Sequence, residues 1–334
     1  MYSYKQKISQ NSKKMTTGGS RLWVFIPVLF LSTAIAFVFL RRGVAEEIKV
    51  EVVKDEYLET LKPTEIRKEP LALIKEESDF PPELIAGSAG IIVDADNGKI
   101  LYAKEADNKM PLASLVKIMT AVITLEHKSL SDYATVTAEA DAVGENEMGV
   151  SEGEAYTIEE LLYGLLLNSG NDAAYTLAEN VAGSSDEFIR WMNRKAQELG
   201  LKNTGFFDPS GLDDRSYTTA ADLVVLTEYA MRHKEFREIV ATVEKELPYS
   251  GLHKYLYLEN QTNLLTTYPG VIGVKTGYTE EAGLCLSTYA ENSGKKLVGI
   301  VLNSIDRKGD MIIMLDYGFS RYGIIVEHHL LDIF

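Results

Sequence analysis

The chain is organised around one apolar stretch, Pro111-Leu112-Ala113-Ser114-Leu115-Val116-Lys117-Ile118-Met119-Thr120. Its pattern predicts a helix on which Ser114 and Lys117, three residues apart, lie on the same face. A hydroxyl is a weak nucleophile unless a base is close to it, and a lysine among apolar neighbours can lose its charge and act as that base. The pair therefore indicates a nucleophile with its base. An amphipathic helix that happens to carry one serine and one lysine is the structural alternative, because Ser293 and Lys296 repeat the spacing in a predicted turn.

Composition and charge narrow the possible functions. The 334-residue chain is 46% hydrophobic and 25% charged, which is typical of a globular protein with a sizeable core. Its formal net charge of −15 argues against a nucleic-acid partner, because phosphate binding requires clustered lysine and arginine. The single cysteine, Cys285, excludes an internal disulfide, and the five histidines lack the spacing of zinc ligands. We therefore expect neither a metal site nor a cofactor.

The N-terminal region predicts a membrane anchor. Residues 1–21 are basic and contain no acidic residue, and residues 22–40 carry no charge and are followed by the arginine pair 41–42. This length suits the hydrocarbon core of a bilayer, and the basic flank favours a cytoplasmic N-terminus. A cleaved secretory signal is the alternative, with small residues Gly43 and Ala45 at suitable cleavage positions. We expect an uncleaved anchor, because the run is long and ends in two arginines; the rest of the chain is exported in either case.

The exported part divides into a linker and one domain. Residues 41–85 alternate charged with isolated apolar residues and contain four prolines, which predicts an extracytoplasmic linker. In residues 86–334, strand patterns lie at the two ends and helix patterns lie between them. This predicts an α+β domain whose distant ends form one antiparallel sheet, with an inserted helical region and a cleft at the junction. Strands are expected at 89–94, 99–103, 273–276, 283–290 and 296–302, helices at 114–127, 158–167, from 172 onward, 185–199, 218–231 and 309–322, and irregular structure at 136–150.

Local signals define two of the predicted helix starts. Thr157 and Glu160 have the spacing of a capping box. Ser185 is expected to cap the helix that follows it. Both signals place helices in the middle of the domain, as the inserted helical region requires.

Two more motifs follow the serine–lysine pair in order. Ser169-Gly170-Asn171 lies in a tight connection between predicted helices, and Lys275-Thr276-Gly277 lies on a predicted strand. Each has a plain structural alternative: the first motif could be a helix end followed by a new cap, and the second resembles the tail of a P-loop but lacks its spacing. The three motifs in this order and in these settings are a strong signal, typical of the β-lactamases and penicillin-binding proteins.

The sequence resembles the serine D-alanyl-D-alanine carboxypeptidases, which are the low-molecular-mass penicillin-binding proteins. The resemblance extends over residues 86–322 and includes the wider segments 111–120, 168–174, 210–214 and 273–279. Glycine in the middle of the second motif is similar to the carboxypeptidase branch, where the lactamase form has aspartate. The resemblance implies a β-lactamase/DD-peptidase-like fold and a serine DD-peptidase catalytic domain in residues 86–334. It also implies covalent binding of β-lactam antibiotics.

The resemblance implies catalytic roles for three side chains. Ser114 would attack the carbonyl of a D-Ala-D-Ala peptide bond in a peptidoglycan stem peptide and form an acyl-enzyme. Lys117 would be the base for acylation, and Ser169 would relay protons toward the leaving amine. The backbone N–H groups of Ser114 and Tyr278 would hold the oxyanion.

It also implies binding roles. Asn171 would hold the substrate's amide, and Lys275 and Thr276 would bind the terminal carboxylate in a charge-assisted contact. Gly277 would let the substrate backbone lie close to the strand. The side chain of Tyr278 is expected to form a wall of the site, and Ser210-Gly211-Leu212-Asp213-Asp214 a structural turn.

One departure from the family concerns the C-terminal region. Well-known members carry a further β-rich domain and a C-terminal amphipathic helix, whereas only residues 323–334 follow the expected closing helix here. We expect the N-terminal span to take over the role of anchor, with the catalytic domain outside a bacterial cell membrane. A β-lactamase, a DD-endopeptidase and a penicillin-binding sensor without turnover are the functional alternatives.

Overall fold

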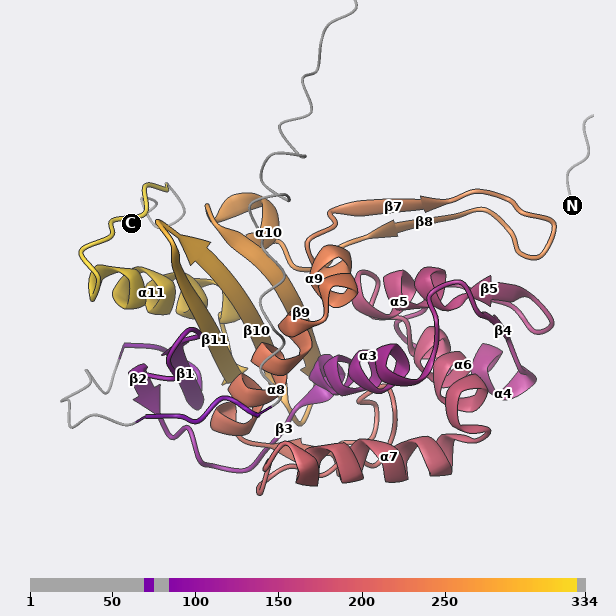
Figure 1. Ribbon diagram of the computed structural model, residues 1–334, viewed down its shortest axis with the longest axis horizontal. Coiled ribbons are helices and arrows are strands. Elements are labelled where there is room, and N and C mark those ends of the chain that lie inside the picture. The colour runs from indigo at the N-terminus through magenta and orange to yellow at the C-terminus, as the bar shows by residue number, and fades with distance from the viewer. Residues whose placement is uncertain (1–68, 75–83, 329–334) are drawn as a thin grey trace, which may run out of the picture. The chain divides into compact units, whose positions relative to one another are not determined.

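The computed structural model describes residues 69–74 and 84–328, and a central five-stranded antiparallel sheet organises them (Figure 1). Its strand order is β2-β1-β11-β10-β9. The first strand of the domain, β1, pairs with the last, β11, from Ala89 opposite Leu302 to Asp94 opposite Leu297. The predicted α+β fold, with a sheet formed by both ends of the domain, is confirmed. The strands are Ala89–Asp94 (β1), Ile100–Lys104 (β2), Val271–Thr279 (β9), Gly283–Asn292 (β10) and Lys295–Ser304 (β11).

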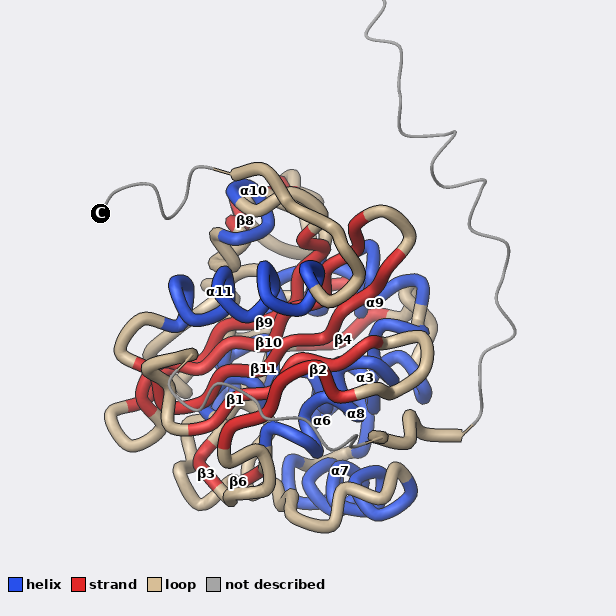
Figure 2. The backbone as a smooth tube through the Cα atoms, turned by 90° about the vertical axis from the view of Figure 1, so that its left-hand side faces the viewer, coloured by secondary structure: helices blue, strands red, loops and turns tan. Residues whose placement is uncertain are grey.

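Helices cover the two faces of this sheet. Helix α11 (Arg307–Ser320) lies on one face and α8 (Ala220–Arg232) on the other (Figure 2). Every residue of β1 is buried. Successive strand residues point to opposite faces, so Ile91 joins the core on the α8 side while Ile92 joins the core on the α11 side. Burial on both faces explains why β1 is a continuous apolar run without alternation.

The chain between β2 and β9 forms the helical region, to which short strand pairs are added. The short strands pair as β3 with β6, β4 with β5, and β7 with β8. The helical elements are Ala113–Leu115 (the 3₁₀ turn η1), Val116–His127 (α3), Ala138–Asp141 (α4), Ile158–Leu166 (α5), Asn171–Ala182 (α6), Ser185–Glu198 (α7), Lys234–Val240 (α9) and Leu264–Thr267 (α10). The short strands are Met110–Pro111 (β3), Tyr133–Thr135 (β4), Ala155–Thr157 (β5), Tyr217–Thr218 (β6), Glu244–Leu247 (β7) and Leu256–Glu259 (β8).

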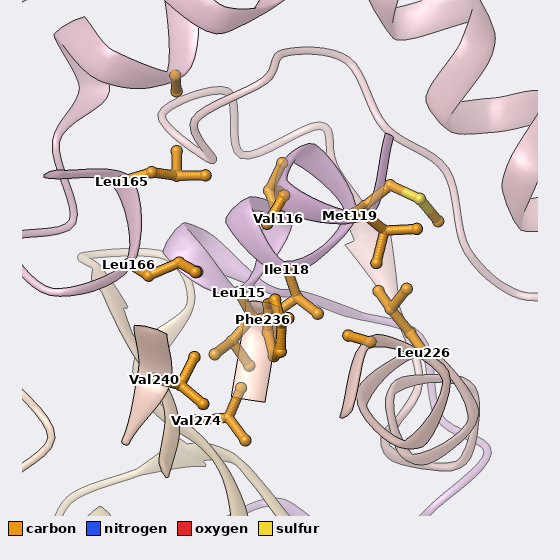
Figure 3. Close-up of a cluster of buried hydrophobic side chains, with 14 of the residues drawn as sticks. Leu115, Val116, Ile118, Met119, Leu165, Leu166, Leu226, Phe236, Val240 and Val274 are labelled. Carbon is orange, nitrogen blue, oxygen red and sulfur yellow. The ribbon is translucent and has the colours of Figure 1, made fainter. Parts of the chain in front are cut away.

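Helix α3 forms the centre of the helical region. All its residues from 116 to 124 are buried, and a helix that is buried all round needs partners on every side. Helices α5, α6, α7, α8 and α9 surround it. Figure 3 shows its first turn among buried side chains that include Leu165, Leu226, Phe236 and Val274, from the helices and from β9. The element that carries the serine–lysine pair is thus fixed by packing, and its side chains start from a rigid base.

Most predicted boundaries agree with the structure, but several details were wrong, and several short elements, including α9 and α10, were not predicted. The capping box of Thr157 and Glu160 is present. Ser184, not Ser185, caps α7 and accepts a hydrogen bond from Glu187 N, because Ser184 has the extended backbone that a cap requires. Part of the stretch predicted to be irregular forms the short helix α4. The β7–β8 hairpin was not predicted, because its charged β7 strand lacks the apolar alternation of a buried strand.

Residues 69–74, the first described part of the predicted linker, pack on the domain. Leu71 is buried, with 3% of its surface exposed. The Ile74 N–H donates to the Gly98 oxygen over 2.8 Å, and Ile74 O accepts from Ile100 N over 3.0 Å. The predicted basic tail 1–21 and anchor 22–40 lie outside the described residues. Within residues 69–74 and 84–328, no helix combines the length and the apolar character that crossing a bilayer requires.

Candidate active site

Ser114 lies in the 3₁₀ turn that immediately precedes α3, and Lys117 lies in the first turn of α3. Their side chains meet, with Lys117 Nζ 3.1 Å from Ser114 Oγ. The residue before the serine, Ala113, has a left-handed backbone with φ of +47°, which is uncommon for a residue with a Cβ. This conformation begins the tight turn from which Ser114 projects. The contact between serine and lysine predicted from their spacing is therefore present.

Lys117 is wholly buried and is surrounded by oxygen atoms. Besides Ser114 Oγ, its Nζ lies 2.7 Å from Asn171 Oδ1 and 2.7 Å from the Ser210 backbone oxygen. The structure thus brings together the first motif, the second motif and the turn at residue 210. A lysine with three oxygen partners has a fixed position, which general base catalysis requires.

The electrostatic environment of Lys117 favours a neutral amine. Burial lowers the pKa of Lys117 from the usual 10.5 to about 7, while the carboxylates of Asp208, Asp172 and Glu145 act in the opposite direction. The desolvation of the ammonium is thus the dominant effect, and nearby negative charge limits it. At neutral pH a substantial fraction of the molecules would therefore hold Lys117 as a free amine, far more than an exposed lysine would.

The second motif joins the end of α5 to the start of α6. Asn171 binds Lys117 through Oδ1, donates from Nδ2 to Gly144 O over 3.1 Å, and donates from its backbone N to Asn146 O over 2.7 Å. Ser169 is buried with a left-handed φ of +61°. Its hydroxyl has no hydrogen-bond partner among the described residues, and none of its atoms is bonded to the Ser114–Lys117 pair. A buried hydroxyl without a partner is costly, which is consistent with a group that acts only when substrate is present.

Glycine in the middle of this motif has a geometric reason. A Cβ on Gly170 would lie 2.8 Å from Met148 N and 2.8 Å from Asp172 Oδ1. The Asp172 carboxylate accepts hydrogen bonds from the N–H groups of Met148, Gly149 and Val150, over 2.7 to 3.1 Å. The loop therefore lies directly against the motif, and the absence of a side chain at position 170 allows it.

The third motif lies on β9, next to the nucleophile turn. Lys275 and Thr276 are buried, and Lys275 Nζ donates to the backbone oxygen of Thr276 over 3.0 Å. Burial and the positive charges of Lys117 and Arg307 hold the pKa of Lys275 well below its usual value. Lys117 and Lys275 are thus two buried lysines whose pKa values are both lowered, chiefly by burial. The predicted carboxylate site is thus a position at which negative charge would be stabilised.

Gly277 lies close to the protein's own backbone. A Cβ on Gly277 would lie 3.2 Å from Leu112 O, from Ala113 Cβ and from Ser114 N. Glycine there lets β9 pack against the nucleophile turn, and its expected contact with the substrate backbone stays a prediction. The neighbouring Tyr278 has 59% of its surface exposed, as a wall of an open site requires.

Several groups at the site were not found from the sequence. The segment 210–214 was interpreted as a structural turn, yet the Ser210 carbonyl is a partner of Lys117. A backbone carbonyl leaves no side-chain signature, so no motif could have revealed it. Arg307 donates to Gly277 O over 2.8 Å and lies 30 residues beyond it in the chain, too far for a short motif. In the part of the chain that the structure describes, no group of three His, Cys, Asp or Glu residues could hold a metal ion.

Comparison with known proteins agrees with this geometry. A sequence family described as D-alanyl-D-alanine carboxypeptidase matches residues 75–306. The D-alanyl-D-alanine carboxypeptidase DacF of Bacillus subtilis is 34% identical over 263 residues, which cover 76% of this chain and 67% of that protein. The crystal structure of a Streptomyces DD-transpeptidase is 32% identical with a TM-score of 0.67, covering 74% of this chain and 100% of its own. That of a Mycobacterium tuberculosis D-alanyl-D-alanine carboxypeptidase is 31% identical with a TM-score of 0.67, covering 75% and 96%.

The family match spans well over half of the chain and includes the motifs of Ser114, Ser169 and Lys275. The solved relatives share its fold at more than 30% identity. The chain therefore belongs to the family of the D-alanyl-D-alanine carboxypeptidases.

Proposed function

We propose that this protein is a serine-type D-Ala-D-Ala carboxypeptidase that removes the terminal D-alanine of peptidoglycan stem peptides through an acyl-enzyme on Ser114. One observation carries the proposal: the Ser114 hydroxyl lies 3.1 Å from a wholly buried Lys117 whose pKa is about 7. That pairing supplies a nucleophile with a base at neutral pH. The family supports the same reaction, because its matched relatives are named for it.

Acylation begins with the two groups already in contact, Ser114 and Lys117. Neutral Lys117 takes the Ser114 proton as Oγ bonds to the carbonyl carbon, and the N–H groups of Ser114 and Tyr278 hold the oxyanion. When the C–N bond breaks, the proton passes to the nitrogen of the leaving D-alanine, with the Ser169 hydroxyl as relay. Water then hydrolyses the ester and restores Ser114. A β-lactam would acylate the same oxygen, because its strained amide occupies the place of the scissile bond.

The free carboxylate of the substrate selects the C-terminus. Lys275 and Thr276 lie on β9 beside the nucleophile turn, and a carboxylate there would favour the charged form of Lys275. Asn171 would bind the substrate's amide. Its Nδ2 already donates to Gly144 O, so binding exchanges this partner for the substrate's carbonyl. No metal or cofactor takes part in the proposed chemistry.

We further propose that residues 22–40 anchor the protein in the bacterial membrane, with the catalytic domain on the outer side where peptidoglycan lies. Their uncharged sequence and the basic residues before them support this placement. Extraction of bacterial membranes with alkaline carbonate tests it. The full chain should remain in the membrane pellet, and a variant lacking residues 22–40 should not.

The enzymatic proposal is tested with the full chain in detergent and a peptide ending in D-Ala-D-Ala. We expect release of D-alanine and covalent labelling by penicillin, and Ser114→Ala should lose both. Ser293→Ala is the matched control, because Ser293 has the same spacing to a lysine but lies in the β10–β11 turn. Labelling without release would favour a sensor that does not turn over. Cleavage of a cross-linked peptide dimer in preference to the free C-terminus would favour an endopeptidase, the activity for which a relative of 31% identity from Pseudomonas aeruginosa is named.

A further inference from the structure

Asp208 lies outside the three motifs and is buried. Its Oδ2 accepts hydrogen bonds from the N–H groups of Ser210, Gly211 and Leu212 over 3.1, 2.8 and 3.0 Å, and from Ser210 Oγ over 2.5 Å. Its Oδ1 lies 3.4 Å from Ser216 Oγ. One carboxylate therefore organises the whole turn from 208 to 212, in the manner of an anion bound by successive backbone N–H groups.

This turn touches the catalytic elements at two points. The Ser210 oxygen accepts from Lys117 Nζ over 2.7 Å, and the Pro209 oxygen accepts from Thr120 Oγ1 over 2.6 Å. Lys117 and Thr120 are one turn apart on α3. The Asp208 carboxylate thus holds the turn in place, and the Ser210 carbonyl of that turn holds the amine of Lys117 in position.

Asp208 also brings a negative charge close to Lys117. The charged groups whose fields act on Lys117 are the carboxylates of Asp208, Asp172 and Glu145, while the field of Lys117 acts on Lys275 of β9. Asp208 and Asp172 are buried, whereas Glu145 is exposed and therefore screened by solvent. Within the described residues neither buried aspartate forms an ion pair with a lysine or arginine. The charge of Asp208 also acts on Arg215, but that guanidinium is exposed and paired with Asp213, so solvent screens its effect.

We propose that Asp208 is a positioning residue of the catalytic site, which folds the 208–212 turn onto Lys117 and places beside it a charge that determines the acid limit of activity. The inference rests on the proposed function, in which neutral Lys117 is the base. A nearby carboxylate favours the ammonium form. Removing that charge therefore makes the lysine neutral at lower pH.

The substitution Asp208→Asn distinguishes the effect of the negative charge of Asp208 from the effect of its shape and hydrogen bonds. The amide oxygen still accepts from the backbone N–H groups of the turn, and the amide nitrogen takes the place of Oδ1 beside Ser216 Oγ, a hydroxyl that can also accept. The negative charge is lost while the shape of the side chain is kept. We expect the acid limb of kcat/KM to move to lower pH by about one pH unit. A residue that served only to hold the turn would lower the plateau of the profile and leave the limb in place.

The experiment measures D-alanine release by the full chain at pH values on both sides of neutrality. The substrate is a peptide that ends in D-Ala-D-Ala and whose amino groups are all acetylated, so that the substrate itself does not titrate in this pH range. Asp310→Asn is the matched control: Asp310 is buried and accepts from Ala86 N, Gly87 N and Ser304 Oγ over 2.8, 2.8 and 2.6 Å. It belongs to α11, which covers the opposite face of the sheet from α8 (Figure 2). Asp310→Asn should reduce thermal stability without moving the limb.

Asp172→Asn provides a second variant that does not depend on the 208–212 turn, and its limb should also move to lower pH. A downward shift in Asp208→Asn supports the inference. If Asp208→Asn folds and the acid limb of its kcat/KM profile does not move, the inference is overturned. If Asp208→Asn does not fold, an unmoved acid limb in Asp172→Asn overturns it. The proposed function fails on a different result, namely an unchanged protein that releases no D-alanine or whose release shows no acid limb.

Discussion

Replacing Gly211 by alanine would place a methyl group 2.0 Å from the Ala113 carbonyl oxygen and 2.9 Å from Ser114 N. Ordinary contact begins at 3.4 Å, so the two backbones must separate by about 1.4 Å, the difference 3.4 − 2.0. A displacement of about 1 Å at a catalytic group costs roughly 100-fold in rate. We therefore expect kcat/KM for D-alanine release to fall at least about 100-fold. The left-handed φ of +87° at this position adds about 1–2 kcal/mol of backbone strain.

The assay compares this variant with Gly251→Ala. Gly251 has a similar φ of +81°, but a methyl group there would meet nothing within 4 Å. Both variants should lose about 1–2 kcal/mol of unfolding free energy from backbone strain, and only Gly211→Ala should lose activity. Urea denaturation and D-alanine release measure the two effects. Near-normal kcat/KM in Gly211→Ala, or an equal loss in Gly251→Ala, would refute the claim that close approach to Ala113 positions the nucleophile.

Three further predictions follow from the same geometry. The rate constant of penicillin acylation should fall as the pH decreases through about 7, because burial lowers the pKa of Lys117 to about 7 and protonation removes the base; a rate that does not change with pH across neutrality would contradict this. Gly164→Ala should slow acylation, because its methyl group would lie 2.1 Å from Met148 Sδ and displace the loop that Asp172 holds. Adding Met148→Ala removes Sδ and Cγ but leaves the Cβ of residue 148 at 2.9 Å, so it should restore part of the rate, and a double variant as slow as the single one would count against the explanation. Phe236→Ala should reduce the unfolding free energy by about 3–5 kcal/mol, because its ring is wholly buried beside the start of α3 (Figure 3). Urea denaturation followed by circular dichroism measures the change. A loss below about 1 kcal/mol would contradict the prediction and show that neighbouring side chains fill the cavity.

The elements predicted from the sequence are those whose signals are local. The strand patterns at 89–94 and 283–290 depend on apolar runs and turns, and both strands are present in the predicted sheet. The pairing of Ser114 with Lys117 follows from helical spacing alone, and their contact is present even though Ser114 lies in a 3₁₀ turn. Local periodicity decides such features, and tertiary contacts only refine them.

The features that were missed depend on contacts between distant segments. Ser210 reaches Lys117 through a backbone oxygen across 93 residues, and any residue type could have supplied that atom. The β7–β8 hairpin contacts Asn168, the residue just before the second motif, whose Oδ1 accepts from Glu259 N over 2.9 Å. Neither contact has a spacing that a sequence pattern could express, because loop closure over such distances is determined by the packed fold.

Glycines explain how segments so far apart meet at one serine. Gly211 brings the 208–212 turn against Ala113, and Gly277 brings β9 against Ser114 N. A Cβ at Gly211 would overlap the opposing backbone at 2.0 Å, and a Cβ at Gly277 would crowd it at 3.2 Å. The side chains that react are recognisable from the sequence because their chemistry restricts the residue type. At Gly211 and Gly277 the residue type is restricted as well, because a side chain would not fit there. That restriction can be recognised only when the position of the opposing backbone is known. The reactivity of Ser114 therefore depends on residues with no reactive group at all, and substitutions at Gly211 and Gly277 should impair catalysis while every catalytic side chain is still present.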